Sequence, residues 1–334
     1  MIEPRIEESC GHELMSWSPV VSSRLKQELE SMASKTPSLI ASIKRLIDAD
    51  LSVSSPFRLL PFAISGALSK DESAALPVAV LSRIWWLGAE VFDDLTDGKF
   101  NTAEVGLSRP QAIVVSTACL SAVPSMIIKQ LDVGVDFKAA CEWEYADSTL
   151  AAAGSQLDDV SNGEIRSWSD VMKIYAGKSG APYERDVALT ALSAGAEEDR
   201  IRGWRVFGRL FGVLRQLAND RSCVDASEDE DLINGTWTLL LAHAMEILSP
   251  PKRAELGDLR NLARDSSAAR AQVTELLGSP DVASQYNRRI MILHSRLSHL
   301  ISLLAEPTEC RDTIQWMIDV STSDAFLTVP EARK

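Results

Sequence analysis

The sequence predicts an all-α protein built as a single large helical bundle. Over most of the 334 residues, apolar side chains recur every three or four positions, as they do on the buried face of a helix. Alternating runs of β-branched residues bounded by turns, which are typical of strands, are missing from the sequence. No internal repeat and no linker rich in glycine, serine or proline divides the chain. We therefore expect one domain over residues 1–334.

Proline in a first helical turn, preceded by a serine, threonine or aspartate cap, marks where helices begin. The expected starts are Pro19, Pro37 and the region of Asp71, the last with a restart at Pro77. The helix that follows Pro77 is strongly apolar and is expected to run to Asp97 and stop at Gly98. Further helices are predicted over 109–131, 137–160, 168–194, 197–222, 236–248, 254–276 and 279–305, with a shorter one after 309.

The composition of the chain argues against several classes of function. The chain has 34 Lys and Arg against 47 Asp and Glu, a net charge of −13, which argues against nucleic acid or an anionic membrane as the main partner. Five scattered cysteines without CxxC spacing indicate a reducing compartment. The N-terminus lacks the pattern of a signal peptide, and the apolar stretch 110–128 is broken by Pro124, so no transmembrane segment is expected. We expect a cytoplasmic protein with a small-molecule ligand.

A cluster of carboxylates ends the apolar helix that follows Pro77. Asp93 and Asp97 are four residues apart and share one face, with Asp94 beside them and Glu90 one turn before. A solvated acidic helix end is the ordinary explanation of such a cluster. The apolar sequence around it favours a second one, in which the carboxylates bind a hard cation such as Mg²⁺, which often bridges to substrate phosphates.

Two further segments carry polar residues on otherwise apolar helices. Asn219 and Asp220 would add oxygen ligands for a metal and Arg221 would offset phosphate charge, although a solvated helix end is the more ordinary explanation of these residues taken alone. Lys178-Ser179 invites comparison with a phosphate-binding P-loop. We reject that motif because Met172 stands where it requires glycine and no strand precedes it.

Six segments, taken in order, resemble motifs of the trans-isoprenyl diphosphate synthases, the all-α superfamily that includes the class I terpene synthases. The resemblance is strongest over residues 40–250. Asp93–Asp97 is similar to the first aspartate-rich motif of the family, and Gln216–Asp220 to the second. The other four segments are Ser55–Pro61, Gly154–Asp158, Lys178-Ser179 and Asp231–Leu239, similar to the Gly-Gly-Lys-Arg, Gly-Gln-x-x-Asp, Lys-Thr and Asp-Leu-x-x-Gly-Lys motifs.

This resemblance implies a bundle with a central active-site cavity in which Mg²⁺ and an allylic prenyl diphosphate bind. The implied catalytic residues are Asp93, Asp94 and Asp97, and the implied metal ligands are these three with Asn219 and Asp220. Diphosphate would be held by Arg58, Lys178 and Arg221. Trp85, Trp86, Ala89, Asp158 and Gln216 would line the substrate cavity.

Departures from the family pattern concern the acceptor. A Lys, an Arg and a His or Gln hold isopentenyl diphosphate in the family, whereas this chain has Phe57, Arg58 and Trp86 at those positions. The second aspartate-rich motif has Asn219 and Cys223 in place of its first and last aspartates. Loss of charge-assisted contacts weakens binding of an anion, so ordinary chain elongation is not expected.

Three functions remain open at this point. The leading hypothesis is a terpene synthase that ionises an allylic diphosphate and lets the carbocation cyclise or be quenched, with Trp86 either as an electron-rich cavity wall or simply as core. The second is a prenyltransferase that uses an acceptor other than isopentenyl diphosphate. The third is a non-catalytic subunit of a heteromeric synthase. Family members are commonly dimers, which keeps a homodimer open.

Overall fold

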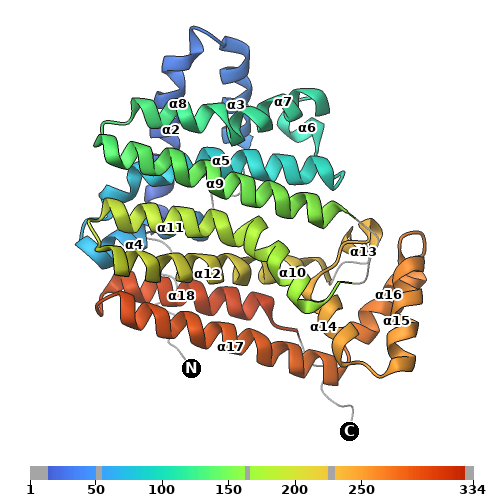
Figure 1. Ribbon diagram of the computed structural model, residues 1–334. Coiled ribbons are helices and arrows are strands. Elements are labelled where there is room, and N and C mark those ends of the chain that lie inside the picture. Colours follow the sequence, from blue (N-terminus) through green and yellow to red (C-terminus); the bar gives the residue numbers. More distant parts are fainter. Residues whose placement is uncertain (1–13, 50–54, 162–165, 225–229, 328–334) are drawn as a thin grey trace. The chain divides into compact units, whose positions relative to one another are not determined.

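The computed structural model describes residues 14–49, 55–161, 166–224 and 230–327, without the side chains of 222–224 and 230. Every regular element among these residues is a helix, which confirms the all-α prediction (Figure 1). The side chain of Cys223 and the N-terminal residues that bear on a signal peptide lie outside what the structure describes.

Packing divides the chain into two compact units. The first contains Met1–Thr149, Arg185–Arg205 and Ile301–Met317, and the second contains Leu150–Glu184, Val206–Leu300 and Ile318–Lys334. Five long helices contribute residues to both units. These are α9 (Val135–Val160), α11 (Ala181–Ser193), α12 (Glu198–Val224), α17 (Pro280–Leu304) and α18 (Glu309–Ala325). The single domain stays a prediction.

The first unit is organised around the apolar helix α5 (Leu76–Thr96), which packs against α2, α4, α7 and α8. The other helices that lie entirely within this unit are α2 (Trp17–Ala33), α3 (Pro37–Ala49), α4 (Leu60–Ser69), α6 (Thr102–Val105), α7 (Arg109–Leu120) and α8 (Ala122–Gln130), with 3₁₀ turns at Pro56–Leu59 and Glu72–Ala75.

Local sequence explains both ends of α5. The Asp71 carboxylate accepts a hydrogen bond from the backbone N–H of Ser73 and caps the short turn before the helix, and Pro77 occupies the first turn of α5 itself. At the other end Gly98 adopts a positive φ of 80°, and the backbone N–H of Lys99 bonds to the Asp94 carbonyl at 2.8 Å. The predicted stop at Gly98 is confirmed.

Gly88, in the middle of α5, permits a close approach of α7. A Cβ atom at this position would lie 2.8 Å from the Cβ of Cys119, and the Ser116 hydroxyl donates a hydrogen bond to the Gly88 carbonyl at 2.9 Å. Glycine at this position therefore serves the packing of α7 against α5.

Several boundaries differ from the prediction. The helix start expected at Pro19 lies at Trp17 in α2, whereas α3 begins at Pro37 as predicted. The predicted helix 109–131 breaks at Ser121, and Pro124 lies within the first turn of α8, where proline is tolerated. The predicted helix 254–276 is two helices, α15 (Pro250–Ala263) and α16 (Ser267–Leu277), because the Ser266 side chain caps a new start. Helix α4 was not predicted.

Within the described ranges, one segment, Glu72–Thr96, is long and apolar enough to span a membrane by length and composition, with a mean hydropathy of 1.3 over its most apolar window. In the structure 67% of that window is buried inside the protein, as in a core helix. Helices α7 and α8 pass the same criterion only when taken together, across a bend of 40°.

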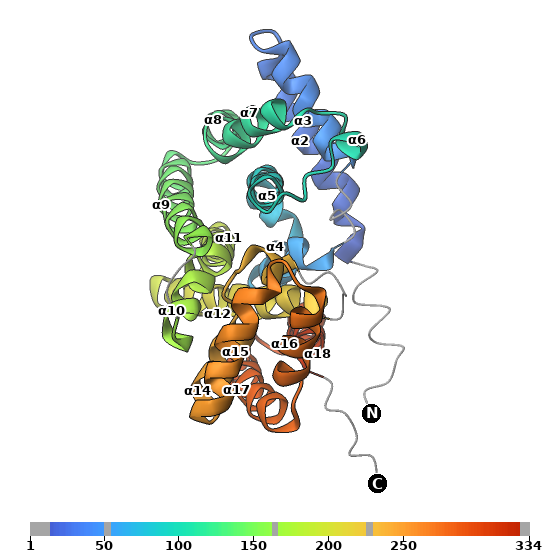
Figure 2. The ribbon, with the colours of Figure 1, turned by 90° about the vertical axis from the view of Figure 1, so that its right-hand side faces the viewer.

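Helices α10 (Trp168–Tyr175), α13 (Glu230–Asn234), α14 (Leu239–Ile247), α15 and α16 lie entirely within the second unit, and α15 and α16 lie side by side there (Figure 2). A π-helical turn, Ala176–Gly180, joins α10 to α11. A Cβ atom at Gly212 of α12 would lie only 2.4 Å from the Ser179 carbonyl oxygen. Glycine at this position is therefore what lets α12 pass directly against the π-turn.

His243 of α14 is fully buried against the rings of Trp168 and Tyr286, with centroid distances of 6.0 and 5.7 Å. Burial, and secondly the positive charge of Arg289, lower the pKa of His243 to about 4, against smaller opposing effects of the Val282 backbone and Glu246. The folded protein therefore keeps this imidazole neutral under conditions in which the unfolded chain binds a proton.

We predict that the free energy of unfolding falls as the pH is lowered from 6.5 toward 4. In this window the unfolded chain gains a proton at His243 and the folded chain does not, which costs up to about 3 kcal/mol. Urea unfolding of the wild type and of His243→Leu at pH 7.5, 6, 5 and 4.5 measures the effect. The variant should lose less stability than the wild type across the window, whatever its stability at pH 7.5. Parallel curves would contradict the prediction.

Candidate functional site

In the first unit, the carboxylates of Asp93, Asp94 and Asp97 gather at the C-terminal end of α5. Asp93 and Asp97 are half-buried, and the backbone N–H of Asp97 bonds to the Asp93 carbonyl at 2.9 Å, which places them one turn apart as the sequence predicted. The Lys99 ammonium lies 3.6 Å from the Asp97 carboxylate. This is the unfavourable end of a helix for negative charge, since the helix dipole is negative there.

The pKa of Asp94 lies above its ordinary value. It is raised to about 6, first by desolvation and then by the negative charge of Asp93, with smaller contributions from Glu90 and Asp97 that Lys99 partly offsets. A cation bound among the carboxylates would remove this repulsion.

The donor set fits a hard divalent cation because it consists of carboxylate oxygens, the ligands that Mg²⁺ and Ca²⁺ prefer. Among the described residues, no three side chains of His, Cys, Asp or Glu lie close enough together to hold one metal ion. Binding at Asp93 and Asp97 would therefore leave coordination positions for water or for oxygens of a substrate, as is usual for Mg²⁺.

Arg58, a predicted diphosphate ligand, is engaged with two side chains of α5. Its guanidinium lies 3.6 Å from the centroid of the Trp86 ring, and it forms a charge-assisted hydrogen bond with the Glu90 carboxylate. Glu90 and Trp86 are four residues apart and share one face of the helix. Trp86 is therefore covered by a cation of the protein itself.

Behind Trp86 lies a buried ion pair. The Arg185 Nε donates to the Asp186 carboxylate at 2.8 Å, and the other oxygen of Asp186 accepts from the Ser82 hydroxyl at 2.7 Å and from the Trp86 indole N–H at 3.2 Å. This pair fixes the orientation of Trp86.

Trp85, predicted to line the cavity, is only 2% exposed. Its indole N–H donates to the Thr149 hydroxyl at 2.7 Å, and the Arg185 guanidinium stacks 4.5 Å from its ring. We assign Trp85 to the core of the unit. Ala89, four residues before Asp93, is half-buried.

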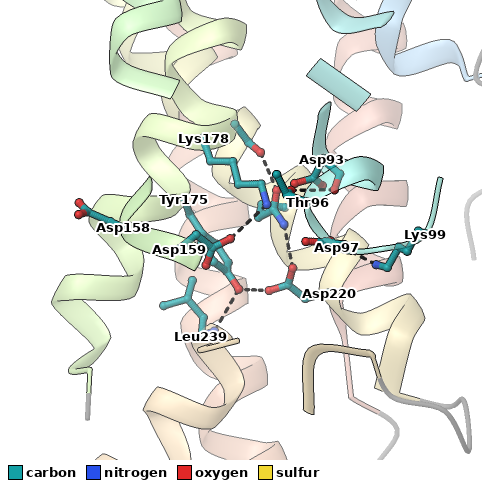
Figure 3. A network of polar contacts seen from close by, with 12 residues as sticks. Asp93, Thr96, Asp97, Lys99, Asp158, Asp159, Tyr175, Lys178, Asp220 and Leu239 are labelled. Carbon is teal, nitrogen blue, oxygen red and sulfur yellow. Dashed lines mark hydrogen bonds and ion pairs between the residues drawn. The ribbon is translucent and has the colours of Figure 1, made fainter. Parts of the chain in front are cut away.

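In the second unit, the Asp220 carboxylate is held by a network that joins three segments (Figure 3). The Tyr175 hydroxyl donates to one oxygen of Asp220 and itself accepts a hydrogen bond of 3.1 Å from the backbone N–H of Leu239. The Gln216 amide donates to the other oxygen at 2.9 Å, and its carbonyl accepts from the Ser179 hydroxyl at 2.6 Å. The network fixes the carboxylate before any ligand binds.

Lys178 projects from the π-turn and forms an ion pair with Asp159 at 3.1 Å (Figure 3). The sequence pointed to Asp158 of the same helix, but the side chain of Asp158 is exposed and its neighbour Asp159 is the partner of Lys178. Gly177 allows this approach, because a Cβ atom there would lie 1.9 Å from the hydroxyl of Ser155.

Two other predicted residues lie close to Asp220 in the sequence. Asn219 is exposed on α12. The Arg221 Nε donates to the backbone carbonyl of Phe326 at 3.1 Å and so ties α12 to the end of α18. A structural contact thus uses at least part of the guanidinium that was expected to bind diphosphate.

Sequence reasoning missed several residues that organise these two clusters. Tyr175, Asp159 and Asp186 carried no motif of their own, and their partners lie 45, 19 and 100 residues away. Glu90 was noted only as one more carboxylate. The available signal was helical spacing, since Glu90 lies one turn from both Trp86 and Asp93 or Asp94.

No protein-family model and no curated protein sequence matches the chain. Solved structures, in contrast, do match the chain. A decaprenyl diphosphate synthase from Rhodobacter capsulatus aligns with a TM-score of 0.78 and 11% identity, covering 95% of this chain and 98% of that one. Geranylgeranyl pyrophosphate synthetase from Pyrococcus horikoshii gives 0.76 and 15%, covering 94% and 98%.

A third similar structure is the geranylgeranyl pyrophosphate synthase of Corynebacterium glutamicum, complexed with calcium and isoprenyl diphosphate. It has a TM-score of 0.75 and 19% identity, and 94% of this chain and 98% of that one are covered. The predicted resemblance is thus confirmed at the level of the fold. This chain has the fold of the trans-isoprenyl diphosphate synthases.

Proposed function

We propose that the protein is a Mg²⁺-dependent enzyme that ionises an allylic prenyl diphosphate, acting as a terpene synthase of the isoprenyl-diphosphate-synthase type. The observation that carries the proposal is the combination of two features in the first unit. The carboxylates at the end of α5 are intact, whereas Arg58 is engaged by Trp86 and Glu90. The first feature suits metal-assisted departure of a diphosphate, and the second disfavours a second anionic substrate.

The fold supports the substrate class. The synthase of Corynebacterium glutamicum has been crystallised with isoprenyl diphosphate and magnesium, and it shares the fold of this chain at 19% identity with a TM-score of 0.75. By analogy, Asp93, Asp94 and Asp97 bind metal on the first unit, and Asn219 and Asp220 do so on the second. The metal supplies Lewis-acid stabilisation of the leaving diphosphate.

The remaining roles follow from charge. Lys178 carries a positive charge beside Asp159 and is the best placed cation of the second unit to bind a diphosphate oxygen, in exchange for its present partner. Arg221 contributes charge near Asp220, and Gln216 orients that carboxylate. A cytoplasmic location agrees with this soluble class of substrate.

An alternative is a prenyltransferase whose acceptor is not isopentenyl diphosphate, which the engaged Arg58 supports equally. Incubation with Mg²⁺ and C10, C15 or C20 allylic diphosphates, each with and without isopentenyl diphosphate, distinguishes the two. Hydrocarbon or alcohol products from one substrate alone support a terpene synthase. Phosphate release only after addition of a neutral acceptor supports the transferase, and longer diphosphates contradict both.

We predict that Asp93→Asn lowers the rate of diphosphate release about 100-fold or more, because a metal ligand that stabilises the leaving group is lost. Diphosphate release is followed with a coupled colorimetric assay. Asp136→Asn, which removes an exposed carboxylate from the first turn of α9, serves as the control and should retain full activity. An active Asp93→Asn would refute the role of this carboxylate.

Tyr175→Phe should raise the Mg²⁺ concentration required for half-maximal activity about tenfold or more, since the Asp220 carboxylate loses the hydroxyl that orients it. Tyr145→Phe is a matched control, because no hydrogen bond of the Tyr145 hydroxyl is found within the described part of the chain. The measurement is a Mg²⁺ titration of activity at saturating substrate. Equal Mg²⁺ dependence of the two variants would argue against the role of Tyr175.

We also propose that two copies of the chain associate through α9. Leu150 and Leu157, on the part of α9 that belongs to the second unit, are 74% and 66% exposed and lie seven residues apart, with the small residue Ala153 between them. An apolar stripe with this spacing is typical of a helix that packs against another helix. A second copy presents the same stripe and would cover it.

If so, Leu150→Glu should shift the protein from dimer to monomer in light scattering coupled to size-exclusion chromatography. The buried carboxylate would lack a partner in the helix pair. Leu262→Glu alters a leucine on α15 that is 59% exposed, and this variant should remain dimeric. A monomeric wild type would contradict the proposal outright.

A further inference from the structure

Arg58 is engaged by two of the protein's own side chains in a way that resembles ligand binding. A carboxylate, Glu90, forms a charge-assisted hydrogen bond with the guanidinium, and the Trp86 ring stacks on it at 3.6 Å. The side chains of Arg58 and Glu90 are 20% and 34% exposed, so solvent screens the pair only in part.

The Trp86 ring is held in place from the other side. Its N–H donates to Asp186, and its plane stands at 86° to Trp85 with 5.3 Å between ring centroids. Rotation of Trp86 away from Arg58 would break the hydrogen bond to a buried carboxylate and disturb the packing of Trp85, which is 2% exposed. The stacked arrangement is therefore a rigid part of the unit.

An anion that approached Arg58 would meet two obstacles. The anion would have to replace Glu90 as the partner of the guanidinium. The displaced Glu90 carboxylate would remain one turn from Asp93 and would repel the anion.

We propose that Glu90 is a specificity-determining residue that occupies Arg58 as an internal anion and so excludes a second diphosphate from the reaction. The inference rests on the proposed function and deepens it. The allylic diphosphate is the one anionic substrate, and the group that ends the reaction is neutral: water, an internal double bond or an uncharged acceptor.

Calorimetric titration of the full chain with isopentenyl diphosphate, without metal, tests this proposal. Glu90→Leu should bind the probe at least about tenfold more tightly than the wild type, because the internal competitor is removed. Glu90→Gln, which keeps the shape and loses the charge, should fall between them. Arg58→Met combined with Glu90→Leu should abolish the gain. Glu104→Leu, which removes an exposed carboxylate from α6, controls for net charge and should bind as the wild type does.

The proposal is overturned if the wild type binds isopentenyl diphosphate as tightly as Glu90→Leu, or if Glu104→Leu gives the same gain. Thermal unfolding of each variant verifies that it is folded, and Glu90→Gln carries the test if Glu90→Leu is not. Turnover of allylic diphosphates by the wild type is measured separately. Its absence, with the gain in Glu90→Leu intact, would refute the proposed function and leave this inference standing.

Discussion

The first unit depends on the buried ion pair between Arg185 and Asp186. The two side chains are 0% and 5% exposed, and both also bond to other helices: Arg185 donates to Ser148 of α9, and Asp186 accepts from Ser82 and Trp86 of α5. Loss of one partner from such a pair strands a charge in the core, which costs about 3–5 kcal/mol. Helix α5 also carries the carboxylates at its end. The position of those carboxylates therefore depends on the contact between Trp86 and Asp186, two turns earlier on the same helix.

In the second unit, a glycine and hydroxyl-bearing side chains hold the Asp220 carboxylate in place. Gly212 brings α12 against the π-turn, and this approach puts Ser179 within hydrogen-bonding distance of Gln216. Gln216 and Tyr175 then hold the two oxygens of Asp220. A bulkier residue at 212 would displace the π-turn and break the contact between Ser179 and Gln216, which would leave Tyr175 as the single partner of the Asp220 carboxylate. Gly212 thus affects the position of this carboxylate without contacting it.

Features that depend on short segments of the sequence were predicted well, whereas contacts between residues far apart in the sequence were not. The all-α class and the end of α5 at Gly98 follow from periodicity and from one residue that tolerates a positive φ, both of which are properties of short segments. Helix α4 was missed because the proline in its first turn, Pro61, is not preceded by a capping serine, threonine or aspartate. The break at Ser121 was missed because the apolar pattern continues across it. Tyr175 was missed for a different reason. Its partner Asp220 lies 45 residues away, and the sequence around neither residue indicates the contact. Candidate ligands were thus recognisable from the sequence, whereas the residues that orient them were not.

The π-helical turn at Ala176–Gly180 has a consequence for how this protein can change over evolutionary time. A π-turn accommodates one residue more than the α-helical path it interrupts. Loss of that residue would let α10 and α11 run on as one regular helix with both flanks in their present register, and the side chains of the turn itself would be re-aimed. Lys178 would then point in another direction with its neighbours unchanged. A single-residue deletion or insertion, rather than a substitution, is thus the simplest genetic route by which relatives of this chain could redirect the lysine and take a different substrate.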